Sequence, residues 1–329
     1  MISSIQLACR KIIACENDFY EMKKSGEELY HIFSTITGID IHKLNEGDIY
    51  LPSGKAISPS GAAHCLIEMK RTAVFLRGIN KAINLKLADK AEKPIRILYV
   101  GTGPFGSLVI PLLPLYKPTQ IIVDLLEINP LSLEALQKVI DTIGLRGFIG
   151  EIYCADAATF KVNKQYDIVI SETMLACLRS EPQVAIMQNL IPQLSANSIF
   201  IPEEISIDAS LTNSKMEQDR LLFHEGEKPE FRRIELGNVF KVTKNNLDAG
   251  KMRKVIDIPA NVPDFPILKL FTTVTVFENE VLCENDSSIT LPVTFCDLRN
   301  NHVEQVEFCY KQGARPLIEC KILVNESII

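Results

Sequence analysis

The chain has 329 residues, a length that predicts about two domains at roughly 100 to 200 residues each. Hydrophobic residues make up 47% of it and charged residues 23%, which excludes wholesale disorder. Asp and Glu outnumber Lys and Arg by 41 to 35, so the net charge of −6 gives no broad positive field for nucleic acid or an anionic membrane surface. We therefore expect neither a nucleic-acid partner nor a membrane partner.

The cysteines, the histidines and the first residues indicate a cytoplasmic protein without a metal. Nine Cys are scattered along the chain without a C-x-x-C pair, which is typical of reduced thiols rather than of a disulfide framework or a zinc site. The first residues mix charged and apolar side chains too early for a secretory signal, and no apolar run reaches the ~18 residues that a membrane span needs. No metal-ligand spacing relates His31, His42, His224 and His302 to each other or to Cys.

The first part of the chain, residues 1–92, is predicted to be a helical cap. Apolar residues recur at helical spacing near the N-terminus and again across 62–83. A loop rich in Gly, Pro and Ser, at 51–61, separates the two helical groups. The apolar positions that define the first group are Ile5, Leu7, Ile12 and Ile13.

The middle of the chain, residues 93–211, alternates short β-branched runs with helical patterns, which is typical of βαβ units and a parallel sheet. Its clearest helix, 132–143, ends before Gly144. From about Glu203 the pattern changes, and short runs separated by turn residues indicate antiparallel strands in a β-rich domain at 212–329. The predicted strands are 95–100, 120–126, 148–154, 167–170 and 198–201 in the middle region, and 270–277, 288–295 and 303–310 in the last.

A glycine-rich turn follows the first strand of the middle region. The sequence VGTGPFG places Gly101, Gly103 and Gly106 in a G-x-G-x-x-G pattern, where the backbone can turn sharply and approach a ligand closely. The second strand then ends at Glu127, 21 residues after the last of these glycines. A carboxylate at this position can accept hydrogen bonds from both hydroxyls of a ribose. Together the two features predict a site for an adenosine-containing cofactor.

The end of the third strand, IYCADA, leaves the identity of this cofactor open. Asp156, beside the backbone N–H of Ala157, is placed to hold an adenine edge. That arrangement suits both a nicotinamide dinucleotide and S-adenosylmethionine (SAM), although it is more typical of methyltransferases.

The fourth strand leads into two carboxylates that favour SAM. The sequence SETMLACLRSE presents Glu172 at the strand tip and Glu181 nine residues later, with Met174 between them. Two carboxylates converging beside a cationic sulfonium would orient a guanidinium or amine and draw positive charge from its nitrogen. A nicotinamide dehydrogenase has no use for such a pair. The alternative for Glu181 is an ordinary acid at the start of a helix, favoured there by the helix dipole.

These motifs resemble those of the protein arginine methyltransferases, over roughly residues 60–211 with a plausible continuation to the end. The family pattern has an Arg-Thr pair on a helix before the glycine loop, a ribose-binding Glu, and a loop with two glutamates nine residues apart. This chain supplies Arg71-Thr72 in LIEMKRTAVFLRGI, then VGTGPFG, LLEINP and SETMLACLRSE. The resemblance implies a helical cap, a Rossmann-like SAM domain and a C-terminal β-rich domain, which are the three regions that the patterns themselves predict.

The resemblance also implies roles and shows departures. Arg71 would pair with the carboxylate of the SAM methionine moiety, and Met174 would lie near the sulfonium. Methyltransferases commonly have an acid where this chain has Tyr99, and family members usually close the substrate channel with a loop containing Trp, a residue absent here. Pro111 and Pro114 should shorten or kink the helix after the glycine loop.

We therefore predict a SAM-dependent methyltransferase with S-adenosylhomocysteine (SAH) as product. Glu172 and Glu181 would hold a nitrogen of a protein arginine or of a small-molecule guanidine or amine, and a homodimer is compatible with the resemblance. Two alternatives remain open at this point. The chain could be an NAD-dependent oxidoreductase built on the same glycine loop, or a catalytically silent SAM-binding scaffold.

Overall fold

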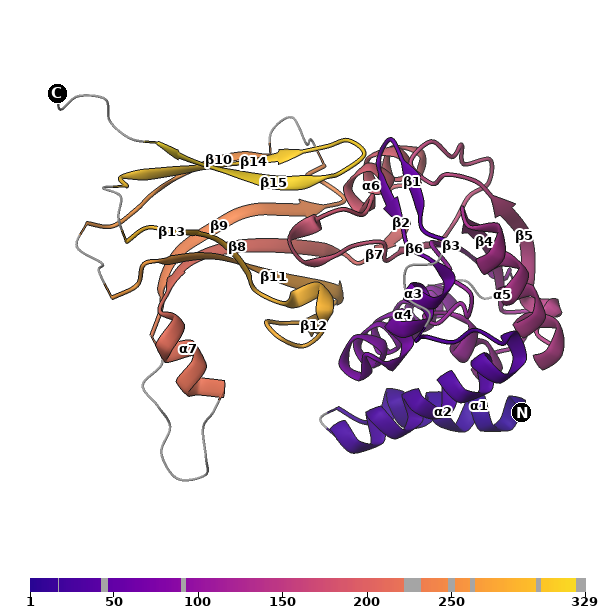
Figure 1. The fold of residues 1–329 in the computed structure, drawn as a ribbon. Coiled ribbons are helices and arrows are strands. Elements are labelled where there is room, and N and C mark those ends of the chain that lie inside the picture. The colour runs from indigo at the N-terminus through magenta and orange to yellow at the C-terminus, as the bar shows by residue number, and fades with distance from the viewer. Residues whose placement is uncertain are drawn as a thin grey trace.

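A computed structural model describes residues 1–16, 18–42, 47–89, 93–221, 232–247, 252–260, 264–299 and 303–323 of the chain. Helices from the first part, a parallel sheet from the middle and antiparallel strands from the last part form neighbouring regions (Figure 1). Most of the charged stretch 226–235, together with His224 and His302, lies outside the described residues. No described helix has the length and apolar character that crossing a membrane requires.

The N-terminal region is helical, with one hairpin between its helices. Helix α1 (Ile2–Ala14) packs against α2 (Phe19–Thr37), which begins where Asp18 accepts a hydrogen bond from the N–H of Glu21 and ends at Gly38 with φ of 75°. Strands β1 (Ile49–Leu51) and β2 (Gly54–Ala56) pair antiparallel, and β2 lies inside the segment 51–61 that is expected to be a loop. The short α3 (Pro59–His64) and the long α4 (Met69–Asp89) follow. Leu7 is 54% exposed, so it lies outside the core in which Ile5 and Ile12 are buried.

The middle region contains the predicted parallel sheet. Its strand order is β5-β4-β3-β6-β7, and every neighbouring pair is parallel. Helices cover the strands, so β3, β4 and β6 are buried almost throughout, as expected for a sheet of βαβ units. The strands are β3 (Ile95–Val100), β4 (Ile121–Glu127), β5 (Ile149–Cys154), β6 (Ile168–Ser171) and β7 (Ile199–Ile201), all within two residues of their predicted bounds.

Two helices of this region show how the sequence directs local structure. Helix α5 (Pro130–Ile143) begins after Asn129, which accepts from the N–H of Leu131, and ends at Gly144 with φ of 79°. By contrast, the segment after the glycine loop forms turns and a 3₁₀ helix at Ile110–Leu115 instead of an α-helix. Pro111 and Pro114 explain this difference, because each lacks the N–H that an α-helix interior requires. Helix α6 (Gln183–Leu190) precedes β7.

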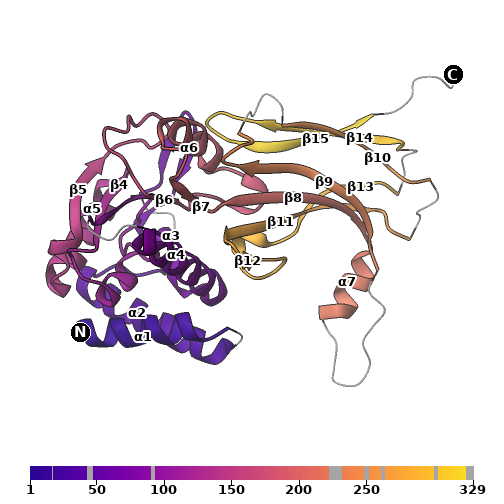
Figure 2. The ribbon, with the colours of Figure 1, turned by 180° about the vertical axis from the view of Figure 1, so that it is seen from behind.

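The last region forms two antiparallel sheets that continue one another. In the first, β8 (Glu204–Thr212) lies between β9 (Ile234–Thr243) and β11 (Ile267–Phe277). The outer edge of β11 pairs with β12 (Glu280–Leu282) at one end and with β13 (Val293–Asp297) at the other. The second sheet has the order β10-β14-β15, and β10 contacts β9. The helix α7 (Ser214–Leu221) projects from the end of β8, as Figure 2 shows from behind. The strands of the second sheet are β10 (Arg253–Asp257), β14 (Gln305–Lys311) and β15 (Leu317–Leu323).

The change from parallel to antiparallel structure falls earlier than the boundary between 211 and 212. The parallel sheet ends with Ile201, and β8 already belongs to the antiparallel sheet. Residues 204–211, which the alternation of patterns assigned to the Rossmann-like region, therefore lie in the β-rich region. The sequence of β8, EISIDASLT, alternates polar and apolar residues, as expected for an antiparallel strand with one buried face, so the boundary agrees with the change of pattern at about Glu203.

Candidate active site

A cavity of about 360 Å³ lies at the carboxyl ends of β3, β4 and β6, where open α/β sheets bind ligands. This volume falls within the range of small-molecule sites. Nine of the ten site residues that the sequence singles out line it: Arg71, Gly101, Gly103, Glu127, Asp156, Ala157, Glu172, Met174 and Glu181. Gly106 is not among the described lining residues.

The glycine loop approaches its neighbours so closely that larger residues would not fit. A Cβ on Gly101, which has φ of 66°, would lie 2.4 Å from Cγ2 of Thr173 in the loop after β6. A Cβ on Gly106 would lie 2.4 Å from Cγ1 of Ile110 and 3.0 Å from Cδ1 of Leu136. Gly101 thus lets the loop reach the cavity wall, whereas Gly106 lets it pack on the core beneath.

Glu127 closes the glycine loop onto the end of β4. Its Oε1 accepts from the N–H groups of Ile128 (2.8 Å) and Asn129 (2.9 Å), and its Oε2 accepts from the N–H of Gly103 (2.9 Å). Burial raises the pKa of this carboxyl group, and the three backbone donors oppose that rise. Since a carboxylate offers about four acceptor positions, one position on Oε2 remains for a ligand.

Asp156 and Ala157 lie on the neighbouring wall of the cavity, after β5. The Oδ1 of Asp156 accepts from the N–H of Ala158 at 2.8 Å, which fixes the turn. No described residue accepts a hydrogen bond from the N–H of Ala157. A carboxylate and an N–H thus line the same wall.

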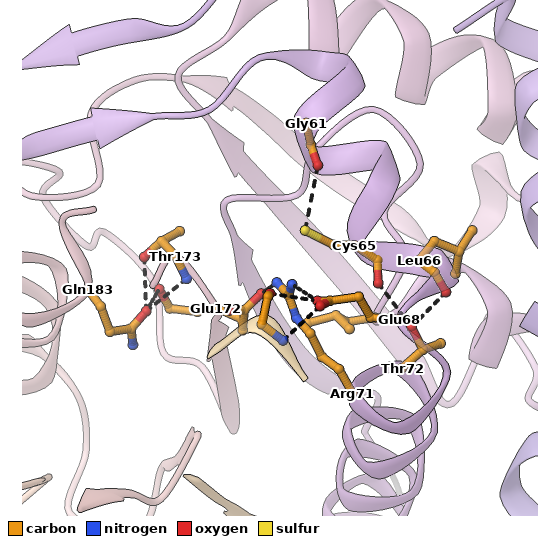
Figure 3. A network of polar contacts seen from close by, with 12 residues as sticks. Gly61, Cys65, Leu66, Glu68, Arg71, Thr72, Glu172, Thr173 and Gln183 are labelled. Carbon is orange, nitrogen blue, oxygen red and sulfur yellow. Dashed lines mark hydrogen bonds and ion pairs between the residues drawn. The ribbon is translucent and has the colours of Figure 1, made fainter. Parts of the chain in front are cut away.

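Arg71 lies between two glutamates, as Figure 3 shows. Its Nη1 donates to Oε2 of Glu68 at 2.8 Å, and its Nη2 donates to Oε2 of Glu172. The N–H and hydroxyl of Ser288, from the loop between β12 and β13, donate to Glu68 in turn. The side chain of Arg71 is only 7% exposed, so its charge depends on these two partners. The β-rich region therefore helps to position a charge inside the cavity.

Glu172 and Glu181 are both buried at one end of the cavity. Glu172 has a side chain 4% exposed, and its Oε1 has no hydrogen-bond partner among the described residues. Burial, together with the negative charge of Glu172, raises the pKa of Glu181 to about 8. Helix α6 begins only at Gln183 and Glu181 is 6% exposed, so Glu181 is not the solvated helix-start acid of the alternative interpretation. This end of the cavity therefore has one carboxylate oxygen without a donor among the described residues and one carboxyl group of raised pKa.

The loop that carries these glutamates is strained. Three non-glycine residues in it, Cys177, Leu178 and Ser180, have φ between 54° and 66°. Residues in this conformation cost about 1–3 kcal/mol each and persist where the surroundings impose them, often at functional sites.

Three other elements impose this loop conformation. The N–H of Cys177 donates to Oγ1 of Thr272 on β11 at 2.9 Å. The N–H of Ser180 donates to the carbonyl of Pro316, in the turn between β14 and β15, and the carbonyl of Ser180 accepts from the N–H of Lys55 on β2, each at 2.7 Å. Within the loop, Gln183 accepts from both the N–H and the hydroxyl of Thr173 at 2.9 Å.

The sequence patterns missed several residues of the cavity wall. Lys55 enters it from the β1–β2 hairpin, with its Nζ 2.9 Å from Oδ2 of Asp48. Glu68 and Ser288 also line the cavity, and both belong to the hydrogen-bond network of Arg71. A Cβ on Gly54 would lie 2.9 Å from the N of Pro182, so the hairpin packs directly against the segment that carries Glu181. Only the Gly in the sequence PSGK could have indicated this contact, and it does not identify the partner.

Tyr99 lines the cavity at the position where the sequence resemblance leads us to expect an acid. Its hydroxyl contacts the carbonyl of Thr102 and the N–H of Leu108, each at 3.4 Å. Burial raises the pKa of this phenol above its usual value, so it stays neutral. Tyr99 therefore braces the glycine loop and carries no negative charge into the cavity. Among the described residues, no group of three or more His, Cys, Asp or Glu could hold a metal ion.

The chain matches no protein-family model and no curated protein sequence. Its fold does match solved structures. The complex of the Trypanosoma brucei PRMT1 enzyme and prozyme, a heterotetramer with AdoHcy, superposes with a TM-score of 0.53 at 12% identity, covering 80% of this chain and 94% of that one. The chain has the fold of the protein arginine methyltransferases.

Two further structures agree with this fold. PRMT6 has a TM-score of 0.53 at 11% identity. The superposition covers 80% of this chain and 99% of the PRMT6 chain. Protein arginine methyltransferase 10 of Arabidopsis thaliana, in an open conformation, has a TM-score of 0.50 at 10% identity, with 80% and 93% of the two chains covered. The predicted fold class, a Rossmann-like domain with a helical N-terminal part and a β-rich C-terminal domain, is thus confirmed.

Proposed function

We propose that the chain is a SAM-dependent methyltransferase that transfers a methyl group to a nitrogen of a protein arginine or of a small-molecule guanidine or amine. The observation that carries the proposal is that one cavity has two chemically different ends. At one end a glycine loop and Glu127 offer backbone and carboxylate contacts. At the other, Glu172 keeps one oxygen without a donor among the described residues, and Glu181 is a buried carboxyl group whose pKa is raised to about 8.

The residues at the first end suit a nucleoside with a methionine tail. The open acceptor position on Oε2 of Glu127 would accept a hydrogen bond from one ribose hydroxyl. The sequence predicts hydrogen bonds from both hydroxyls. Asp156 and the free N–H of Ala157 would hold the edge of an adenine. Arg71 has unused N–H donors beyond those bound to Glu68 and Glu172, and these would bind a carboxylate. Bound SAM would supply a methyl group activated by its sulfonium.

The residues at the second end suit a nitrogen acceptor. The Oε1 of Glu172 and the carboxylate of Glu181 would accept hydrogen bonds from an amine or guanidinium and hold its lone pair in position. A cation in this place would also favour the ionised form of Glu181, whose pKa is raised in its absence. No covalent intermediate on the protein is needed, because alignment and exclusion of water account for most of the acceleration in such transfers.

One observation favours the silent scaffold as a second candidate. Arg71 already pairs with Glu172, so the chain's own guanidinium occupies one oxygen of the acceptor end. A protein that binds SAM while keeping this pair intact would have no place for an acceptor at Glu172.

A two-step experiment tests the proposal. Calorimetry with SAM, SAH and NAD should show binding of SAM and SAH alone; binding of NAD alone would overturn the assignment in favour of an oxidoreductase. The protein is then incubated with SAM carrying an isotopically labelled methyl group and with arginine-containing peptides, free guanidines and amines. Label in a nitrogen acceptor supports the proposal, and SAM binding without transfer to any of them favours the scaffold. Light scattering on the same samples tests the proposed homodimer.

A further inference from the structure

The β-rich region resembles an incomplete barrel: β9 contacts β10 without pairing with it in the described sheets, and we call the gap between β13 and β15 the seam. Through the contact of β9 with β10, the strand order runs β15-β14-β10-β9-β8-β11-β13. The two strands at the ends of this order, β13 and β15, each have one paired edge in the described sheets. Exposed edges of this kind are positions that proteins usually protect.

One cysteine lies on each strand of this seam. Cys296 is on β13, opposite Leu268 of β11, and Cys320 is on β15, opposite Phe308 of β14. Both are free thiols and both are half-buried. In β15, Cys320 lies on the same face as the buried Ile318, and that face points into the barrel.

A bulge in β13 turns Cys296 toward the same interior. The register passes from Leu268 opposite Cys296 to Lys269 opposite Thr294, which leaves Phe295 as the extra residue. A bulge interrupts the alternation of faces, so Phe295 and Cys296 are both shielded from solvent. The ring of Phe295 lies 6.0 Å from that of Phe308, the residue opposite Cys320. This contact places the two cysteines in the same part of the interior, and the electrostatic interaction between their thiols identifies them as neighbours.

We propose that Cys296 and Cys320 form a reversible disulfide that closes the seam between β13 and β15, with a low-molecular-weight disulfide such as oxidised glutathione as the oxidant. The cysteine pattern predicts that the nine thiols are reduced, and Cys296 and Cys320 would be an exception to that prediction. The proposal rests on the barrel and is independent of the methyltransferase assignment.

The environment of the pair assigns the two steps of the reaction. The thiol of Cys320 hydrogen-bonds to the sulfur of Cys296, which lowers the pKa of Cys296 and raises that of Cys320. The Cys296 thiolate is therefore the attacking group. It attacks one sulfur of glutathione disulfide, the S–S bond breaks, and one glutathione leaves as a thiolate that takes up the proton of Cys320. Cys320 then attacks the mixed disulfide and releases the second glutathione, so two protein thiols are oxidised and one glutathione disulfide is reduced.

The link would join two supports of the glutamate loop. Strand β13 pairs with β11, whose Thr272 accepts from Cys177, and β15 follows the turn whose Pro316 accepts from Ser180. A covalent bond between β13 and β15 would fix the relative position of these two supports.

The full-length chain is treated with oxidised glutathione and digested without reduction, and its linked peptides are mapped by mass spectrometry. We expect Cys296 joined to Cys320, a melting temperature raised by roughly 5 °C because the unfolded chain is constrained, and reversal of both by dithiothreitol. Reaction of the exposed Cys154 and Cys283 while Cys296 and Cys320 stay reduced would overturn the proposal.

Substitutions then separate the two roles. Cys320→Ser should accumulate a glutathione adduct on Cys296, whereas Cys296→Ser should leave Cys320 unmodified. Cys309→Ser, on the neighbouring strand β14 and also half-buried, is the matched control and should keep the link. Absence of a glutathione adduct on Cys296 in Cys320→Ser, or a link through Cys309, would contradict the assignment. If a serine variant fails to fold, the map of the unaltered chain decides alone.

Discussion

The two ends of the cavity are built in opposite ways. Glu127, at the glycine-loop end, has three backbone donors, all from residues within 24 positions of it in the chain. Glu172 and Glu181, at the other end, are equally buried, yet Glu172 has an oxygen without a partner among the described residues, and the loop between them has three strained residues. That loop depends on contacts with β2, β11 and the β14–β15 turn.

The difference shows which end the fold stabilises by itself. Three N–H donors compensate the buried charge of Glu127, so this end is complete before any ligand binds. At the other end, Arg71 compensates only one oxygen of Glu172, and burial raises the pKa of Glu181, which is typical of a site for a cationic partner. The comparison makes predictions whose expected effects decrease from several kcal/mol to about one.

The largest expected effect is on the pH dependence of stability, through Glu181. Its pKa in the folded chain is about 8 against an ordinary value of 4.5, so between these pH values the folded chain holds a proton that the unfolded chain has lost. The free energy of unfolding should therefore fall as the pH rises through this window. At about 1.4 kcal/mol per pKa unit, the ceiling is about 5 kcal/mol. Glu181→Gln should remove this slope, as measured by urea unfolding from pH 5 to pH 9.

A surface glutamate provides the control for this measurement. Glu319 on β15 has a side chain 58% exposed, so Glu319→Gln should keep the pH dependence of the unaltered chain. Parallel curves for Glu181→Gln and the unaltered chain would mean that Glu181 ionises normally and that the acceptor end carries no unusual cost.

The next effect is on transfer, under the proposed function. Replacing either Glu172 or Glu181 by Gln keeps the shape and removes one negative charge from the acceptor end. Transfer to a nitrogen acceptor should fall about 100-fold, the usual effect of losing one positioned group. The double variant should lose far less than the product of the two, because the groups act together. Affinity for SAM should change little in Glu181→Gln, whereas Glu172→Gln also removes a charged partner of Arg71. A fall in affinity equal to the fall in rate in Glu181→Gln would place that carboxylate at the cofactor instead.

Glu127 tests the opposite end. Glu127→Ala removes the acceptor proposed for a ribose hydroxyl, so affinity for SAH should fall by about 2 kcal/mol, the contribution of one charge-assisted hydrogen bond. Because three backbone donors lose their partner as well, the variant should also unfold at a lower temperature. Glu134→Gln, at a position of α5 whose side chain is 63% exposed, is the control and should leave the affinity unchanged. Calorimetry that finds unchanged affinity in a folded Glu127→Ala protein would remove Glu127 from the site.

The same contrast explains what could be predicted from the sequence. The glycine loop, Glu127 and the parallel strands follow from local patterns, because their hydrogen bonds join residues near one another in the chain. Lys55, Glu68 and Ser288 could not be found, since they reach the cavity through contacts across regions: Ser288 lies 220 residues from Glu68. The exposure of Leu7 was missed for a similar reason, because periodicity does not show which apolar residues find a neighbour.

The smallest expected effect concerns the strain in the glutamate loop. Ser180 has φ of 66°, a conformation that glycine adopts at no steric cost, and no hydrogen bond of its side chain is present among the described residues. Ser180→Gly should therefore raise the free energy of unfolding by about 1 kcal/mol, less the extra freedom that glycine gives the unfolded chain. Ser180→Ala retains the strained conformation and is the matched control, with little or no gain. Chemical unfolding at pH 5, where Glu181 is protonated, separates this effect from the charge. Equal stability of the Gly and Ala variants would show that the loop relaxes around position 180, and that the cost of the acceptor end lies in its carboxylates alone.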